Sequence, residues 1–152
     1  MSEIEKFHEE VRANIKGLGD DGDVQALSRI WVREITRHKY AYNFSWMGRP
    51  IIQFPQDMIA MQEIIWNTKP NLIIETGIAH GGSLIYYASL LQMMRIDGYV
   101  LGIDVDIRNH NRAEIDSHPM RERIEMIEGS SVSTSTVEEV AKHAAGKDSV
   151  MV

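Results

Sequence analysis

The chain has 152 residues, no cysteine and a formal net charge of -6 at pH 7, and 43% of its residues are hydrophobic and 25% charged. This is the length and composition of one soluble globular domain, and without cysteine the chain has no disulfides and no thiolate metal sites. The acidic balance disfavours nucleic acid as a partner, and no apolar run reaches the length of a membrane span or forms a secretory signal, so we expect a cytoplasmic protein.

Apolar residues at helical spacing predict two amphipathic helices within the first forty residues. The first runs from Ile4 to Leu18, where neighbouring glycines supply a stop, and "DDGD" predicts a turn. The second helix starts at Val24 and runs toward Tyr40. The stretch "YNFSWMGRPIIQFP" follows, and its glycine and prolines predict an irregular aromatic segment.

A third helix is predicted to begin after Pro55 and to end near Pro70, since the residue before a proline is pushed out of the helical region. Its predicted buried face consists of Met58, Met61, Ile64 and Ile65.

After Pro70 the pattern becomes that of a parallel α/β protein. Strands are predicted at 72–74, at "YVLGID", at "RIEMIEG" and at "DSVMV". Helices are predicted over 83–94 and over 134–145, the latter with Val137, Val140 and Ala144 facing inward, and a polar crossover lies between the second and third strands. The alternation predicts a parallel sheet covered by helices on both faces.

The fourth predicted strand starts just before the sequence stops at Val152. In folds of this kind the first strand is central and the fourth lies beside it. We therefore expect either a truncated chain or a sheet that a partner chain completes, with truncation the stronger of the two.

The stretch "NLIIETGIAHGGSLIYYASLL" joins the first of these strands to a helix through a glycine-rich loop. Gly77, Gly81 and Gly82 let the backbone turn sharply and let a ligand approach, and Ser83 is placed to cap the helix. A Cβ atom at Gly81 is expected to enter the ligand's space with little loss of fold. The loop alone is weak evidence, because glycine is common in plain strand-to-helix turns.

Two cofactors compete for this loop. Gly77-x-Ala79-x-x-Gly82 is a degraded dinucleotide fingerprint, whereas Glu75-x-Gly77-x-Ala79-x-Gly81 nearly matches the acidic loop of class I S-adenosylmethionine-dependent methyltransferases. An acid two residues before the first glycine repels a pyrophosphate and suits a cationic sulfonium that carries an ammonium group. A buried, merely paired acid is the other interpretation of Glu75.

The later strand ends supply further candidates. Asp104, at the tip of the second strand, is placed to accept hydrogen bonds from both ribose hydroxyls, with Asp106 as the fallback. Ser130 and Ser131 follow the third strand, where a small polar loop meets the adenine edge or simply turns into a helix.

The run from Tyr42 to Glu128 resembles the cephalosporin hydroxylase and rhamnosyl O-methyltransferase family. The resemblance is carried by "FSWMGRPIIQFPQDM", "IIWNTKPNLIIETGIAHGGSLIYYASLL", "GYVLGIDVDIR" and "IEGSS", and "ETGIAHGGS" is its most distinctive part. It implies a Rossmann-like class I methyltransferase fold, with an N-terminal helical and aromatic extension over 1–55 and the cofactor-binding half of the methyltransferase domain over 56–152.

The resemblance implies an S-adenosylmethionine-dependent O-methyltransferase that acts on a hydroxyl of a sugar or an antibiotic-like small molecule. We also expect the chain to form a homo-oligomer. It also implies a divalent metal, magnesium, held by residues beyond Val152, so that the chain as given is expected to lack the catalytic half. No catalytic residue and no metal ligand is assigned within the sequence. The expected cofactor-binding residues are Glu75, Thr76, Gly77, Ala79, His80, Gly81, Gly82, Ser83, Asp104, Ser130 and Ser131.

Several other residues are open to two interpretations. His80 either reaches the methionine end of the cofactor or is a solvated loop residue, and His110 and His118 show no metal-ligand spacing. Tyr42 and Trp46 either line the acceptor's entrance or belong to the core. The alternative functions are a nicotinamide-dependent oxidoreductase and a truncated, non-catalytic paralogue that binds cofactor or a partner subunit.

Overall fold

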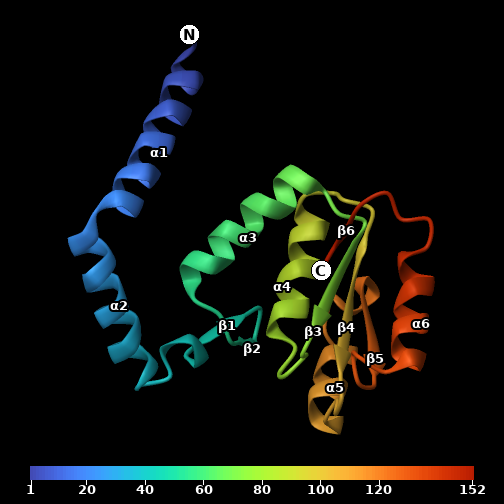
Figure 1. The fold of residues 1–152 in the computed structure, drawn as a ribbon. Coiled ribbons are helices and arrows are strands. Elements are labelled where there is room, and N and C mark those ends of the chain that lie inside the picture. The colour runs from blue at the N-terminus through green and yellow to red at the C-terminus, as the bar shows by residue number, and fades with distance from the viewer. The chain divides into compact units, whose positions relative to one another are not determined.

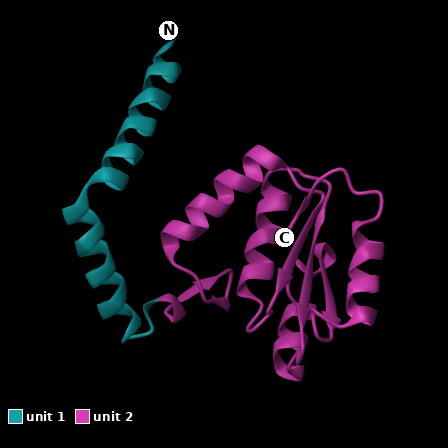
Figure 2. Cartoon of the chain, in the orientation of Figure 1, with its two compact units in different colours: residues 1–40 teal, residues 41–152 magenta.

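The computed structural model describes all residues, 1–152, and divides into two compact units, Met1–Tyr40 and Ala41–Val152. Figure 2 colours the two units. The aromatic segment before residue 55 packs with the second unit, and the sequence-based division at residue 55 stays a prediction. None of the helices has both the length and the apolar character that crossing a membrane requires.

The first unit consists of the two predicted helices, α1 (Glu3–Asp20) and α2 (Gly22–Thr36). Ser2 and Glu5 form a capping box at the start of α1, and the Asp21 side chain accepts hydrogen bonds from two amides at the start of α2. Neither helix contains a buried residue.

A short 3-10 turn, η1 (Tyr40–Tyr42), contains the last residue of the first unit and the first two residues of the second. The second unit continues with a hairpin of β1 (Phe44–Trp46) and β2 (Arg49–Ile51). The prediction of an irregular segment here is wrong. Met47 and Gly48 connect the strands with φ values of +45° and +85°, the conformation of a two-residue hairpin turn. Helix α3 (Pro55–Thr68) follows, with proline in its first turn and Lys69 in the left-handed conformation at its end.

The predicted parallel sheet is confirmed. Its strands are β3 (Leu72–Thr76), β4 (Tyr99–Asp104), β5 (Ile124–Glu128) and β6 (Val150–Met151), in the order β5-β4-β3-β6. All three pairings are parallel, and the fourth predicted strand lies beside the first, as expected. The connecting helices are α4 (Gly82–Met93), α5 (Asn109–Asp116) and α6 (Thr134–Ala144), with a 3-10 turn, η2 (Arg121–Arg123), before β5. Helix α5 replaces the predicted polar crossover.

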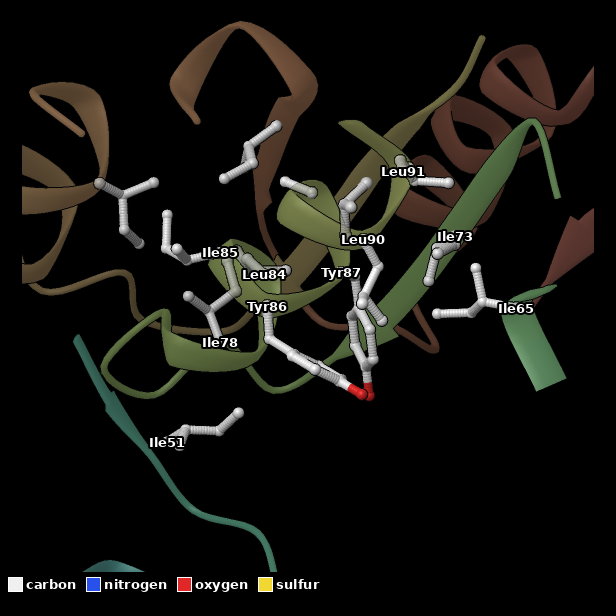
Figure 3. Packing of buried hydrophobic residues seen from close by; sticks show 14 of the residues in the cluster. Ile51, Ile65, Ile73, Ile78, Leu84, Ile85, Tyr86, Tyr87, Leu90 and Leu91 are labelled. Atoms are coloured by element: carbon white, nitrogen blue, oxygen red, sulfur yellow. The ribbon is translucent and has the colours of Figure 1, made fainter. Parts of the chain in front are cut away.

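Helices cover both faces of the sheet, with α4 on one side and α6 on the other (Figure 1). Successive strand residues point to opposite faces, so Ile73 packs with the α4 side and Leu72 and Ile74 with the α6 side. The larger cluster joins α4 to the hairpin through Ile51 and to α3 through Ile65 (Figure 3). It also includes Ile115 of α5. Two residues that were predicted to belong to the buried helix faces are exposed to solvent: the exposed fraction is 46% for Ile64 and 51% for Val137.

Candidate functional site

The loop between β3 and α4 turns through backbone conformations that side chains rarely adopt. Gly77 and Gly81 have φ values of +94° and +81°, and Ala79 lies at +47°. The amide of Gly77 donates to the Ile103 carbonyl at 2.7 Å, and the amide of Gly81 donates to the Ile78 carbonyl at 2.8 Å. The loop is therefore tied to β4 at its start and closed on itself before the helix begins.

Each of the three loop glycines is required for a different reason. A Cβ atom added to Gly77 meets no heavy atom within 4 Å, whereas one added to Gly82 lies 2.1 Å from the Pro50 carbonyl oxygen. One added to Gly81 lies 2.5 Å from Ile115 Cδ1. The expectation that a Cβ atom at Gly81 enters ligand space is therefore wrong, because it enters the core side chain of α5. Gly77 is the glycine that leaves open space beside the loop.

Helix α4 begins without a side-chain cap. Its N-cap residue is Gly81, and no side chain bonds to its first amides. Ser83, which was predicted to cap the helix, lies in its first turn, and its hydroxyl donates to Glu75 Oε2 at 2.8 Å. The positive end of the helix dipole thus faces the loop without an acidic or hydroxyl cap.

Glu75 is a half-buried acid near the end of β3. Burial raises the pKa of its carboxyl group from the ordinary 4.5 to about 7, and the hydrogen bond from Ser83 offsets only part of this. A carboxyl group with this pKa ionises readily when a cation is placed beside it. The side chain that donates to Glu75 is the neutral hydroxyl of Ser83.

Two hollows adjoin the loop and share Ala79 and His80 as lining residues. The smaller has a volume of about 100 Å³, and the larger has a volume of about 350 Å³. The lining of the smaller hollow also includes Gln53, Glu75, Gly77, Gly82 and Ser83. The remaining residues of the larger hollow are Asp104, Val105, Asp106, Arg108 and Asn111. An elongated ligand that crosses the loop therefore meets an acid on each side.

Asp104, at the end of β4, holds the loop in place. Its Oδ2 accepts from the amides of Ile78 at 2.7 Å and Ala79 at 3.4 Å, and its Oδ1 accepts from the amide of Asp106 at 3.2 Å. Burial by itself raises the pKa of Asp104, but the backbone amides that donate to it outweigh this and leave the pKa below its ordinary value. The Asp104 carboxylate also lines the larger hollow.

Arg49 and Asn111 form a clamp on the loop that the sequence analysis did not identify. Arg49 donates to the His80 carbonyl through Nε at 3.0 Å and Nη2 at 2.7 Å, and Nη2 also donates to Asn111 Oδ1 at 3.1 Å. Asn111 is 4% exposed, and its Nδ2 donates to the Ala79 carbonyl at 2.8 Å. The sequence signal for Arg49 was its place in "FSWMGRPIIQFPQDM", and Asn111 gave none, because it falls in the stretch interpreted as a polar crossover.

The structure leaves four of the predicted site residues outside both hollows, and one of them is the buried Gly81. Thr76, Ser130 and Ser131 are exposed and line neither hollow. The side chain that caps α6 is that of Ser133, which lies two residues farther along the chain.

Of the aromatic and histidine candidates, Trp46 belongs to the core. Its ring packs edge-on against Tyr86 with centroids 5.0 Å apart, and its indole N–H donates to Ser89 at 2.9 Å. His118 bonds the Met47 carbonyl at 3.0 Å and so ties the hairpin turn to the end of α5. Tyr42 and His110 are exposed. Nowhere in residues 1–152 do three or more His, Asp or Glu side chains form a group that could hold a metal ion.

Comparison with known families gives a match over most of the chain. The family model described as Rhamnosyl O-methyltransferase/CmcI matches residues 38–152. The rhamnosyl O-methyltransferase of Mycobacterium leprae is 28% identical over 111 residues, and that of Mycobacterium bovis is 30% identical over 112 residues. These alignments take in 69% of this chain and 46% and 44% of the two relatives, so the chain spans about half of the length of the curated relatives it matches.

Solved structures point to the same family. A structure of CmcI with Mg and SAM and an apo structure of CmcI each superpose on this chain with a TM-score of 0.53 and 26% sequence identity. Each match covers 64% of this chain and 40% of the solved chain.

Proposed function

The chain belongs to the rhamnosyl O-methyltransferase/CmcI family, and from this membership we propose that it binds S-adenosylmethionine across the loop between β3 and α4. The observation that carries the proposal is the pairing of Glu75, whose pKa is raised to about 7, with the open space at Gly77. The methyl group is transferred to a hydroxyl of a sugar or an antibiotic-like small molecule. Assembly as a homo-oligomer and the use of a divalent metal stay predictions.

The amino-acid end of the cofactor lies in the smaller hollow. There the Glu75 carboxylate faces the cationic end of the ligand, and the uncapped amides at the start of α4 face its carboxylate. Gly77 admits the ligand because it has no Cβ atom, while Gly81 and Gly82 fix the path of the backbone. Thr76 and His80 stay proposed neighbours of this end.

The nucleoside end lies in the larger hollow, with its ribose at Asp104 and Asp106. Asp104 carries out two functions in this proposal, because it holds the amides of the loop and accepts from a ribose hydroxyl. Asp106 is exposed and lines the same hollow, so it is the second acceptor in reach. A role for Ser130 and Ser131 at the adenine edge requires the loop after β5 to close on the ligand.

The bound cofactor supplies a methyl group on a sulfonium, which is already a good leaving group. The chain's own residues therefore bind, orient and exclude water rather than activate the donor. The clamp of Arg49 and Asn111 contributes here, because it fixes the two loop carbonyls that lie between the hollows. The loop is held at two amides by Asp104 and at two carbonyls by Asn111 and Arg49. A loop held in this way keeps the distance and orientation between the sulfur and the ribose of the ligand constant.

A nicotinamide dinucleotide is the competing ligand for a strand–loop–helix site of this kind. Its pyrophosphate would lie at the start of α4, close to the acid that hydrogen-bonds Ser83. The pyrophosphate and the ionised Glu75 carboxylate would repel each other in this half-buried hollow. A non-catalytic, partner-binding paralogue would require neither ligand.

We expect S-adenosylhomocysteine, at a hundred times its dissociation constant, to raise the melting temperature of the chain by roughly 5–10 °C. Binding to the folded state alone adds about 2.7 kcal/mol at that concentration, and a domain of this size gains a few degrees for each kcal/mol. The check is differential scanning fluorimetry with S-adenosylhomocysteine and NAD in parallel. Stabilisation by NAD would favour the oxidoreductase, and no response to either compound would favour the non-catalytic paralogue.

A further inference from the structure

Gln53 contains the single buried side-chain polar atom in residues 1–152 that lacks a hydrogen-bond partner, its amide oxygen Oε1. Its amide nitrogen Nε2 lies 3.2 Å from the hydroxyl of Tyr87, to which it donates. A buried acceptor without a donor costs roughly 1–3 kcal/mol. Such a group indicates a missing donor, and the residue lines the smaller hollow beside the loop.

The Gln53 side chain is held by a rigid neighbour. Tyr87 is 6% exposed, and its ring lies against that of Tyr86 with centroids 5.3 Å apart. Figure 3 shows the two tyrosine side chains next to each other, with their hydroxyl groups at the same end. Exchanging the amide's oxygen and nitrogen would let the Tyr87 hydroxyl donate instead, so one end of the amide is unpaired in either orientation.

The remaining lining residues indicate which chemical group fills this place. The smaller hollow is lined by Glu75 and by no Lys or Arg. The carboxyl of Glu75 is bonded on one oxygen by Ser83, which leaves further acceptor capacity beside that of Gln53. The hollow has a volume of about 100 Å³ and is lined by two side-chain acceptors, Gln53 Oε1 and the Glu75 carboxylate, and by no Lys or Arg. Such a lining suits a small, positively charged group with several N–H donors.

We propose that Gln53 is a further cofactor-binding residue, whose Oε1 accepts a hydrogen bond from the ammonium group at the amino-acid end of S-adenosylmethionine. The inference rests on the proposed function. Gln53 recognises the end of the ligand that distinguishes S-adenosylmethionine from other adenine nucleosides, so it determines specificity and takes no part in methyl transfer.

The test compares two ligands on two variants by isothermal titration calorimetry. S-Adenosylhomocysteine carries the amino-acid end, and 5′-methylthioadenosine has the same thioether nucleoside without it. In Gln53→Leu we expect the dissociation constant for S-adenosylhomocysteine to rise about tenfold and that for 5′-methylthioadenosine to stay the same. Gln56→Leu is the matched control, because Gln56 is exposed and lines neither hollow, and it is expected to change neither constant.

A second variant covers the case in which the leucine disturbs the fold. Gln53→Glu keeps an acceptor in place of Oε1, so it is expected to bind S-adenosylhomocysteine at least as well as the wild type. Loss of binding in Gln53→Glu would mean that the amide faces the ligand's carboxylate, and this would overturn the proposal.

The remaining outcomes separate the two proposals. An unchanged constant for S-adenosylhomocysteine in Gln53→Leu overturns the role of Gln53 and leaves the cofactor site standing. An equal loss for both ligands also overturns it, because the effect then does not come from the amino-acid end. A wild-type chain that binds neither compound overturns the proposed function and this inference together.

Discussion

Replacing Gly82 by alanine is expected to destabilise the second unit by about 3 kcal/mol and to lower its melting temperature by roughly 10 °C. The added Cβ atom would lie 2.1 Å from the Pro50 carbonyl oxygen and 2.8 Å from Ile51 Cα. These are backbone atoms of β2, so no rotation of a side chain relieves the overlap. The hairpin must move away from α4, and the packing of Ile51 in the larger core cluster is lost with it.

Gly77→Ala is the matched comparison for this prediction. Its Cβ atom meets nothing within 4 Å, so its cost is that of the backbone at φ +94°, about 1–2 kcal/mol. Thermal or urea unfolding of both variants measures the difference. A Gly82→Ala protein as stable as Gly77→Ala would show that the hairpin does not pack against the start of α4 in solution.

The affinity for S-adenosylmethionine is expected to rise roughly fivefold to tenfold between pH 6 and pH 7.5. The pKa of Glu75 is about 7 in the free protein, so its carboxyl is mostly protonated at the lower pH and mostly ionised at the higher. A cationic ligand favours the ionised form, and binding therefore releases a proton. The upper limit of pH 7.5 keeps the ligand's own ammonium group mostly protonated.

Glu75→Gln should bind S-adenosylmethionine about tenfold more weakly than the wild type at pH 7.5, with little dependence on pH. Other titratable groups at this place are the imidazole of His80, which lines the same hollow, and the hydroxyl of Tyr87, whose pKa is raised by burial and by the Glu75 charge. Any pH dependence left in Glu75→Gln measures the share of groups other than Glu75. A wild-type affinity that is flat from pH 6 to pH 7.5 would contradict the role of Glu75.

The same carboxyl group links pH to the stability of the unliganded protein. Its pKa is higher in the folded state than the ordinary 4.5, so the folded chain binds more protons than the unfolded chain between that value and about 7. The free energy of unfolding therefore falls as the pH rises through this window and levels off above it. Glu75→Gln removes this contribution, and its unfolding curves are expected to vary less with pH.

The strands of the sheet could be predicted from the sequence because each is a short apolar run between turns. Leu72, Ile73 and Ile74 are buried on both faces of the sheet, as a continuous apolar run requires. The β1–β2 hairpin could not be predicted in this way, because its strands have three residues each and one contains Pro50. Its turn depends on Met47, a residue that rarely adopts a positive φ.

Helix α5 was missed because its apolar face is only one side chain wide. Its buried residues are Ile115 and Asn111, and the asparagine is held there by hydrogen bonds to the loop rather than by hydrophobic contact. A periodicity of apolar residues does not detect such a helix. Ile64 and Val137 show the converse, because they fit the helical pattern while tertiary packing leaves them at the surface.

In the candidate site, too, local features could be predicted from the sequence, whereas contacts between distant segments could not. The strand–loop–helix order and the acid at the end of β4 are local features, so the sequence placed Glu75, Gly77 and Asp104 around one loop. The partners of these residues depend on contacts between distant segments, as in the bonds from Arg49 to His80 and from Asn111 to Ala79. This explains why Ser83 was predicted to be a cap and why the clamp was not foreseen.

The most direct test of S-adenosylmethionine binding across this loop is a titration of the ¹⁵N-labelled chain with S-adenosylhomocysteine, followed through its backbone amide resonances. The amides of residues 75–83 and of Asp104 and Asp106 are expected to shift most, to saturate together and to report one dissociation constant. Resonances of these residues that stay in place at saturating ligand, or shifts confined to other parts of the chain, would contradict the account.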